Sequence, residues 1–155
     1  MIRRRPASDH WHRLPALPTP RGALATAVLG GRIHAVGGVG WRARNTPAHE
    51  AYDPSANRWI ALASVPTARD HLAAAAIDGR LYAVGGRVDG NYSRNLMANE
   101  AYDPAADRWE ARTPLPTARS GIAAAVLNER MFVFGGEGPG GTVNRSQIRG
   151  PSPCA

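Results

Sequence analysis

The sequence predicts an all-β fold built from tandem copies of one small antiparallel sheet. Three observations carry this prediction: a segment of about 50 residues recurs, short apolar runs of strand length lie within each copy, and turn-forming residues separate the runs. The 155 residues include 17 glycines and 13 prolines, a content that favours many turns and therefore many short strands. Hydrophobic residues make up 43% and charged residues 20%, which is typical of a globular chain.

The repeat becomes visible when three segments are aligned on their first arginines. The segments are RGALATAVLGGRIHAVGG (21–38), RDHLAAAAIDGRLYAVGG (69–86) and RSGIAAAVLNERMFVFGG (119–136). A tryptophan precedes each arginine by ten positions, and EAYDPSANRW (50–59) is matched almost letter for letter by EAYDPAADRW (100–109). Successive tryptophans, which are Trp11, Trp59 and Trp109, lie 48 and then 50 residues apart.

Each complete copy contains four expected strands. In the second copy, two apolar runs flank Asp78-Gly79, a pair that suits a tight hairpin turn because both residues tolerate positive φ. Gly30-Gly31 serves the first copy equally well, whereas Asn128-Glu129 serves the third less well because glutamate is strained at positive φ. EAYDP supplies a third strand that proline stops, and RWIAL (58–62) or RWEAR (108–112) supplies a fourth. By propensity alone HLAAAAI would form a helix. The glycines that bound this run and the Asp-Gly turn after it favour a strand instead.

Four short antiparallel strands in every 50 residues are typical of a β-propeller blade, and the glycine and aromatic positions resemble the kelch-repeat family. The kelch signature is a Gly-Gly pair, then a Tyr, then a Trp about seven residues later. The matching residues are Gly37, Gly38, Tyr52 and Trp59, then Gly85, Gly86, Tyr102 and Trp109, then Gly135 and Gly136. The resemblance covers residues 11–136 and implies a propeller of the galactose oxidase and kelch type, with the aromatic residues packed between blades.

The glycine pairs are interpreted as architectural. A phosphate-binding loop needs Lys-Ser or Lys-Thr after the glycines and a helix behind them, and neither follows here. We expect the glycines to allow close backbone approach between blades. Arg21, Arg69 and Arg119 recur in register and are likewise expected to be structural, pairing with the repeated Glu50 and Glu100.

The expected organisation is a flexible N-terminal tail (1–10), propeller blades (11–136) and an irregular C-terminal tail (137–155). The blades divide at about 11–59, 60–109 and 110–136, so that two are complete and the third is partial. The pattern is lost after about Gly141, which indicates a truncation or a shifted reading frame. An incomplete propeller has open sheet edges, which favour self-association.

Composition excludes several classes of function. The net charge of +7 comes from 19 arginines and no lysine, but they are scattered rather than clustered with aromatics, so no nucleic-acid partner is expected. No segment approaches the ~20 apolar residues of a membrane span, and no apolar stretch follows the basic N-terminus as in a signal peptide. We expect no membrane association and a cytoplasmic location. The single cysteine, Cys154, excludes an internal disulfide framework.

Binding is expected on one face, which the resemblance places at the loops that enter each first strand and that join the second and third strands. The candidate residues are Trp41, Arg42, Arg44, Asp70, His71, Arg87, Asp89, Asn91, Tyr92, Arg94 and Ser120. Arginine and aromatic side chains on loops suit a protein or peptide partner with acidic character. The alternative is that these loops are rich in arginine only because the whole chain is.

Catalytic residues, cofactors and metal ligands are not predicted. Asp70 and His71 are neighbours, and adjacent residues of a strand point to opposite faces, so we expect no relay between them. His10 and His12 are too few for a metal site, and His34 and His49 are expected to be packing or surface residues.

The leading hypothesis is a non-enzymatic protein-interaction module. The alternative is a carbohydrate-binding or carbohydrate-active propeller, either a mutarotase or epimerase or an oxidase-like protein. The cysteine-tyrosine crosslink of galactose oxidase has no counterpart in the terminal Cys154.

Overall fold

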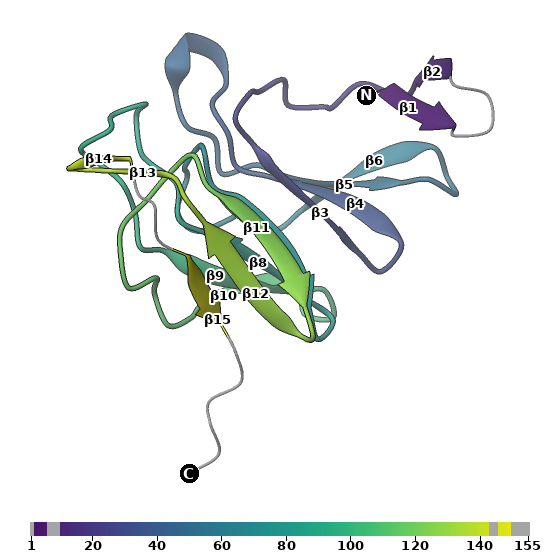
Figure 1. Ribbon diagram of the computed structural model, residues 1–155. Helices are drawn as coiled ribbons and strands as arrows, with labels where there is room; N and C mark the ends of the chain where they lie inside the picture. The colour runs from purple at the N-terminus through teal and green to yellow at the C-terminus, as the bar shows by residue number, and fades with distance from the viewer. Residues whose placement is uncertain (1, 6–9, 143–145, 150–155) are drawn as a thin grey trace.

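The computed structural model describes residues 2–5, 10–142 and 146–149, and the regular secondary structure of these residues is almost entirely β-strand (Figure 1). Two four-stranded antiparallel sheets repeat the same strand order. The first, blade 1, consists of β3 (Ala25–Leu29), β4 (Arg32–Val36), β5 (His49–Asp53) and β6 (Arg58–Leu62). The second, blade 2, consists of β7 (Ala73–Ile77), β8 (Arg80–Val84), β9 (Asn99–Asp103) and β10 (Arg108–Ala111). The all-β prediction and its two complete blades are confirmed.

A third sheet, blade 3, contains three strands in the order β11 (Ala123–Leu127), β12 (Arg130–Phe134) and β15 (Gln147–Arg149). Short hairpins pair β1 (Ile2–Arg5) with β2 (His10–Arg13), and β13 (Glu137–Gly138) with β14 (Gly141–Thr142). The segments expected to be tails therefore carry short strands. For β15 the physical reason is the open edge of β12, whose backbone groups accept a third strand. Cys154 lies outside the described residues.

The hairpin turns have the backbone geometry that their sequences predict. Asp78 and Gly79 have φ values of 49° and 67°, and Gly30 and Gly31 have values of 57° and 73°. Glu129 adopts φ of 58° in the third hairpin, as its position in the repeat requires. Positive φ at both central residues matches the twist of the flanking strands, so each turn sets the register of the hairpin.

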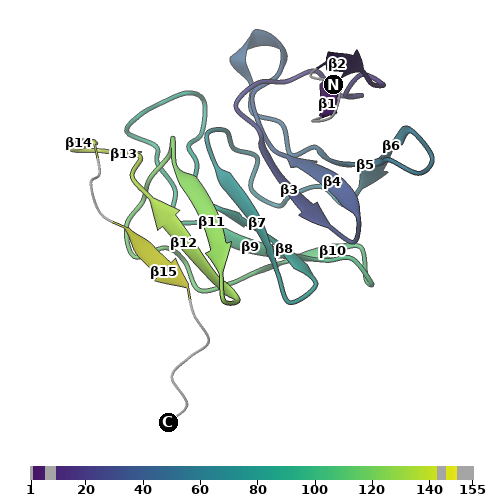
Figure 2. The same ribbon diagram turned by 45° about the vertical axis from the view of Figure 1, so that its right-hand side comes forward.

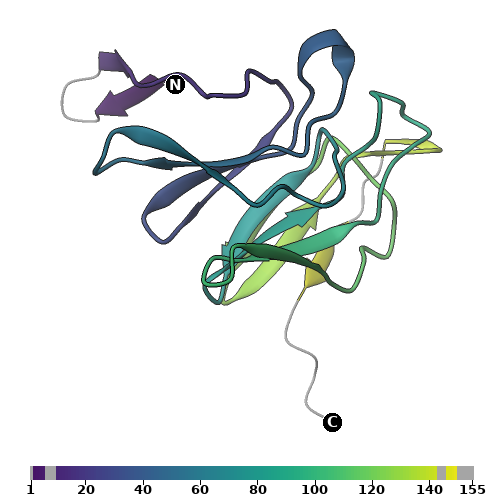
Figure 3. The same cartoon turned by 180° about the vertical axis from the view of Figure 1, so that it is seen from behind.

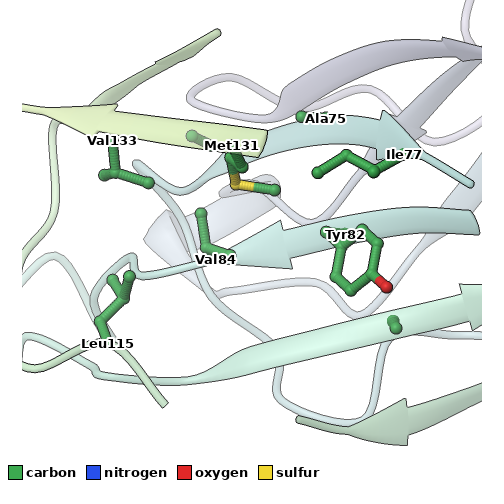
Figure 4. Close-up of a cluster of buried hydrophobic side chains, with 9 residues drawn as sticks. Ala75, Ile77, Tyr82, Val84, Leu115, Met131 and Val133 are labelled. Atoms are coloured by element: carbon green, nitrogen blue, oxygen red, sulfur yellow. The ribbon is translucent and has the colours of Figure 1, made fainter. Parts of the chain in front are cut away.

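The blades lie side by side through their first strands. β3 and β11 both contact β7, and Figure 2 shows the three strands next to one another. Separate apolar clusters fill the two junctions between blades. Figure 4 shows the second junction, where Ile77 and Val84 of blade 2 lie near Met131 and Val133 of blade 3. Figure 3 shows from behind that the sheets follow one another without closing a ring.

The glycine pairs lie where one blade approaches the next, as expected. A Cβ atom on Gly37 would stand 2.7 Å from the carbonyl oxygen of Arg69, and one on Gly85 would stand 2.8 Å from that of Arg119. Both glycines also have φ near +60°. The second glycine of each pair donates its N–H to the same arginine carbonyl, at 2.8 Å for Gly38 and 2.9 Å for Gly86. A side chain at Gly37 or Gly85 would force the blades apart.

The signature aromatics also join neighbouring blades. Trp109 donates its indole N–H to the carbonyl oxygen of Ala63, which follows the last strand of blade 1, at 2.8 Å. Tyr102 belongs to the apolar cluster between blades 1 and 2, and its hydroxyl donates to Asp107 at 2.7 Å. In blade 1, Trp59 donates in the same way to Pro15 at 3.1 Å. Trp109 and Tyr102 therefore pack at the junction between blades 1 and 2.

The repeated arginines form buried ion pairs with the repeated glutamates. Arg21 contacts Glu50 at 2.5 Å, and Arg69 makes the same contact with Glu100. The Arg69 guanidinium also donates to the carbonyl oxygens of Thr67 and Ala83. Each pair therefore ties the segment that enters the first strand of its blade to the second and third strands. The predicted structural role is therefore confirmed for the first two repeats.

Two histidines meet at the junction between blades 1 and 2. His34 Nδ1 lies 2.8 Å from His49 Nε2, and both side chains are buried. His49 Nδ1 lies 3.1 Å from the carbonyl oxygen of Ala63, and the His49 ring packs edge-on against Tyr102 with centroids 4.5 Å apart. Of the two roles considered for these histidines, packing or surface, burial assigns packing, and their contact with each other was not predicted.

Candidate functional site

The loops chosen from the sequence gather at one end of the blades. We define the loop face as residues 39–48 and 87–98, together with the turns that enter β3, β7 and β11 and the β13–β14 hairpin. Because strands alternate in direction, the end of every second strand lies beside the start of every first strand (Figure 1). Backbone bridges Gly22–Val39, Asp70–Arg87 and Ser120–Glu137 join the two kinds of loop in all three blades.

A buried polar cluster forms the base of this face. Asp70 is 1% exposed and accepts a hydrogen bond from the side-chain amide of Asn45 at 2.6 Å. The Arg87 guanidinium lies 3.4 Å from the Asp70 carboxylate and donates to Glu137 at 2.9 Å and to His71 Nε2 at 3.1 Å. Since Asn45, Arg87 and Glu137 come from blades 1, 2 and 3, the cluster ties the three blades together.

The expectation that Asp70 and His71 point to opposite faces is wrong. Their side chains touch, with His71 Nδ1 lying 2.5 Å from an Asp70 carboxylate oxygen. Neither residue belongs to a regular strand, and His71 has a left-handed φ of 52°, which turns its side chain back toward its neighbour. Because Arg87 occupies the other ring nitrogen, both nitrogens of His71 are engaged. The arrangement positions side chains rather than presenting a free general base.

Backbone hydrogen bonds between the turns that enter the first strands link each blade to the next. The His71 N–H donates to the carbonyl oxygen of Ala23 at 2.9 Å, and the Gly121 N–H donates to that of His71 at 2.8 Å. All three residues have positive φ. Ser120, in the position that Asp70 holds in blade 2, is fully buried, and its hydroxyl oxygen has no hydrogen-bond partner in the described part of the chain. Ser120 is therefore inaccessible to a ligand at this surface.

The first long loop presents its side chains outward. Trp41 begins the short 3-10 turn η1 (Trp41–Ala43) and is 85% exposed. Arg42 and Arg44 flank the end of this turn and are also exposed. Within the described residues neither guanidinium has a carboxylate within 4 Å. Gly40 donates to the carbonyl oxygen of Arg44 at 2.9 Å, which closes the loop into a compact tip.

The second long loop is largely occupied with its own contacts. Arg94 forms an ion pair with Asp89, and the Asn91 side chain accepts from the N–H of Ser93 at 2.8 Å. The backbone N–H of Asp89 reaches across to the Asn45 side chain at 2.5 Å, linking the two loops. The Tyr92 ring covers the Arg87 guanidinium at 4.2 Å from its centroid.

A shallow, open pocket of about 350 Å³ lies beside this second loop. It is lined by Tyr92, Ser93, Glu137, Gly138, Pro139, Gly141 and Thr142. Sequence reasoning missed Glu137 and Asn45. The repeat register contained a signal for Glu137, because this residue follows the third glycine pair as Arg87 follows the second. Asn45 had no such signal, since its contact with Asp70 depends on how the first loop folds.

The described residues offer little support for a metal site or a membrane span. His10 and His12 are exposed on β2. Among the described residues, no group of three or more His, Cys, Asp or Glu side chains gathers as a metal ion would require. In the same part of the chain, no helix has the length and apolar character to cross a membrane.

The fold and the face together define a repeat protein made of consecutive propeller-type blades, with its loops collected at one end. Residues 68–116 match the family model of the Kelch motif. This segment runs from the turn entering β7 to the end of blade 2 and carries one complete copy of the repeat. One copy of the repeat is therefore similar to the Kelch motif, and the successive antiparallel sheets fit kelch-type blades. No curated protein matches the chain.

Proposed function

We propose that this chain is a non-enzymatic interaction module whose loop face binds a protein partner. Kelch repeats generally mediate protein–protein interaction. Within the loop face, the eleven residues chosen from the sequence divide by environment. Asp70, Arg87 and Ser120 are buried and brace the loops, whereas Trp41, Arg42 and Arg44 are exposed. The exposed group is the proposed contact surface.

The observation that carries the proposal is an exposed indole on the same loop tip as two guanidinium groups that have no carboxylate partner in the described residues. Tryptophan and arginine are the side chains that most often dominate binding energy at protein interfaces. A guanidinium binds a carboxylate through two parallel hydrogen bonds, so two of them favour an acidic segment. The buried cluster beneath the loop reduces the ordering cost of binding.

Fluorescence anisotropy with two labelled peptides tests this proposal. One peptide carries three consecutive glutamates beside a leucine, and its match carries three glutamines. We expect preference for the glutamate peptide, and a loss of about tenfold or more in affinity for Arg42→Glu or Arg44→Glu. Arg58→Glu makes the same charge change at an exposed position at the start of β6 and serves as the control. Equal losses in all three variants would show that only net charge matters.

Carbohydrate binding is the second candidate, and the pocket beside Tyr92 favours it. The exposed Tyr92 ring and the Glu137 carboxylate border the same open space, a combination that suits stacking and hydrogen bonding to a sugar. A glycan array with the wild-type chain and Tyr92→Ala separates the two candidates. Sugar binding that is lost in Tyr92→Ala and kept in Arg42→Glu would favour the carbohydrate function over the acidic peptide.

A further inference from the structure

The contact between His71 and Arg87 fixes where the imidazole proton of His71 lies. A guanidinium can only donate, and Arg87 Nη2 lies 3.1 Å from His71 Nε2. Nε2 must therefore accept, so the ring is neutral and its one proton lies on Nδ1, which donates to Asp70 at 2.5 Å. Because a protonated imidazole donates from both nitrogens, this arrangement belongs to the neutral form of His71.

The charged neighbours of His71 come from its own turn, from the second long loop and from blade 3. Asp70 touches the ring, Arg87 begins the second long loop, and Glu137 of β13 contacts Arg87 at 2.9 Å. Blade 1 contributes the neutral side chain of Asn45, which donates to Asp70. Two carboxylates stand against one guanidinium, so a second proton on the ring would balance the charges of the cluster. The His71 side chain is 38% exposed, so water can deliver that proton.

Protonation of His71 is nevertheless incompatible with its contact to Arg87. Two N–H donors would face each other 3.1 Å apart, a distance that leaves no room for an acceptor between them. The bond to Asp70 would become charge-assisted and hold the ring more firmly, so Arg87 is the group that must move. The Tyr92 ring lies over the Arg87 guanidinium, 4.2 Å from its centroid, and would lose this support.

Blade 1 and blade 3 show that the blade architecture does not need this contact. The residues at the position of His71 are Ala23 in blade 1 and Gly121 in blade 3, with φ values of 51° and 62°. In blade 1 the position of Arg87 holds Val39, which forms the same backbone bridge to the turn that enters the first strand. The side-chain contact therefore adds to blade 2 a connection that the turns of the other blades lack.

We propose that His71 is a pH-sensitive switch that controls the order of the second long loop (87–98). Neutral His71 holds Arg87 at the base of the loop face, and gain of a proton releases Arg87 and loosens the loop. Histidine is the side chain that ordinarily changes charge between about pH 5 and pH 8. Any partner that contacts the ordered loop would then bind in a pH-dependent way, because coupling between two bound species is reciprocal. The switch does not require that the loop face bind an acidic partner.

Amide hydrogen exchange, measured by NMR on the whole chain, tests the switch. The N–H groups of Asn91 and Arg94 donate within the loop, to the carbonyl oxygens of Val88 at 3.1 Å and Asn91 at 2.9 Å, so their protection reports its order. After correction for the pH dependence of unprotected amides, we expect this protection to fall about tenfold or more from about pH 7.5 to about pH 5.5. Long-range proton–nitrogen spectra should place the imidazole proton of His71 on Nδ1 at the higher pH.

Two substitutions at His71 remove its titration in different ways. His71→Gln keeps a neutral side chain that can donate to Asp70 and accept from Arg87. His71→Ala installs the residue that Ala23 supplies at the same backbone position of blade 1, so the turn should still form. In both variants the protection should change less than about twofold between the two pH values. His12→Gln removes an exposed histidine of β2 and should keep the wild-type fall.

The buried His34–His49 pair is common to all the proteins compared, so its protonation cannot produce a difference between them. Circular dichroism at both pH values checks that the blades stay folded. Constant protection in the wild type, an equal fall in His71→Gln or His71→Ala, or a proton on His71 Nε2 at the higher pH would overturn the proposal. Failure of the loop face to bind the glutamate peptide would contradict the proposed function and leave the switch intact.

Discussion

The buried contact between His34 and His49 should make the stability of the chain fall as the solution becomes acidic. The His49 ring is 1% exposed and lies among His34, Tyr102 and Trp109. Burial, and after it the neighbouring His34, lower the pKa of His49 from 6.5 to about 4, against smaller opposing effects of the Ala63 carbonyl and Asp107. Arg21 adds a small lowering effect. Burial likewise lowers the pKa of His34, to which Arg32 contributes.

The sign and size follow from proton linkage. Between about pH 6.5 and about pH 4, His49 is largely protonated in the unfolded chain and largely neutral in the folded chain. The unfolded state therefore binds more protons, and acid favours unfolding. The stabilisation is complete above about pH 6.5 and is lost as the pH falls toward about 4. A shift from 6.5 to about 4 corresponds to about 3 kcal/mol at 1.4 kcal/mol per pKa unit. Double protonation would also remove the only acceptor in the His34–His49 hydrogen bond.

Blade 2 supplies the substitutions for the test. Its residues at the same repeat positions are Tyr82 and Asn99, and the Asn99 side chain donates to the carbonyl oxygen of Thr113 at 2.8 Å as His49 approaches Ala63. We expect His34→Tyr/His49→Asn to lose less stability than the wild type between pH 7 and pH 4.5, by roughly 2–3 kcal/mol. Urea denaturation followed by tryptophan fluorescence measures this difference. Equal losses in the two proteins would refute the reasoning.

Two further predictions concern the blade junctions and the buried ion pairs. Gly85→Ala should destabilise the chain by about 3 kcal/mol or more, because its Cβ would meet the Arg119 carbonyl, whereas Gly79→Ala, at similar φ with open space around it, should cost about 1 kcal/mol. Similar midpoints of thermal unfolding for both variants would contradict a close approach. Arg69→Met should cost about 3–5 kcal/mol by leaving Glu100 buried without its partner, and Arg69→Met/Glu100→Leu should recover much of that loss in urea denaturation. No recovery in the double variant would count against this explanation.

The blades could be predicted from the sequence because the features that produce them are either local or repeated along the chain. The Asp78-Gly79 turn needs only two residues with positive φ, and the alternation of strands around it follows from strand length. The Arg69–Glu100 pair was predictable because Arg21 and Glu50 hold the same places in the first copy, 29 residues apart where Arg69 and Glu100 are 31 apart. Repetition makes a distant contact visible, since a residue that pairs in one blade must have its counterpart in the next.

The loop cluster was harder to predict because its contacts occur once. Eleven loop residues were predicted to share one face, but the role of each depends on burial that no local pattern reveals. Arg87 looked like a surface ligand and instead lies buried between Asp70 and Glu137. His71 was expected to point away from Asp70, yet its left-handed backbone turns it inward. Both outcomes follow from how three blades converge at their loop ends.

The repeating unit could be predicted from the residues alone: a four-stranded blade with its turns, its glycine pair and its internal ion pair. These features arise from backbone sterics and from spacings that are repeated along the chain. Which polar side chains brace the loops, and the contact between His34 and His49, became evident only when the blades were seen packed together. The physical reason is that burial depends on the neighbouring blade, and neighbours are set by packing between copies rather than by the residues within one.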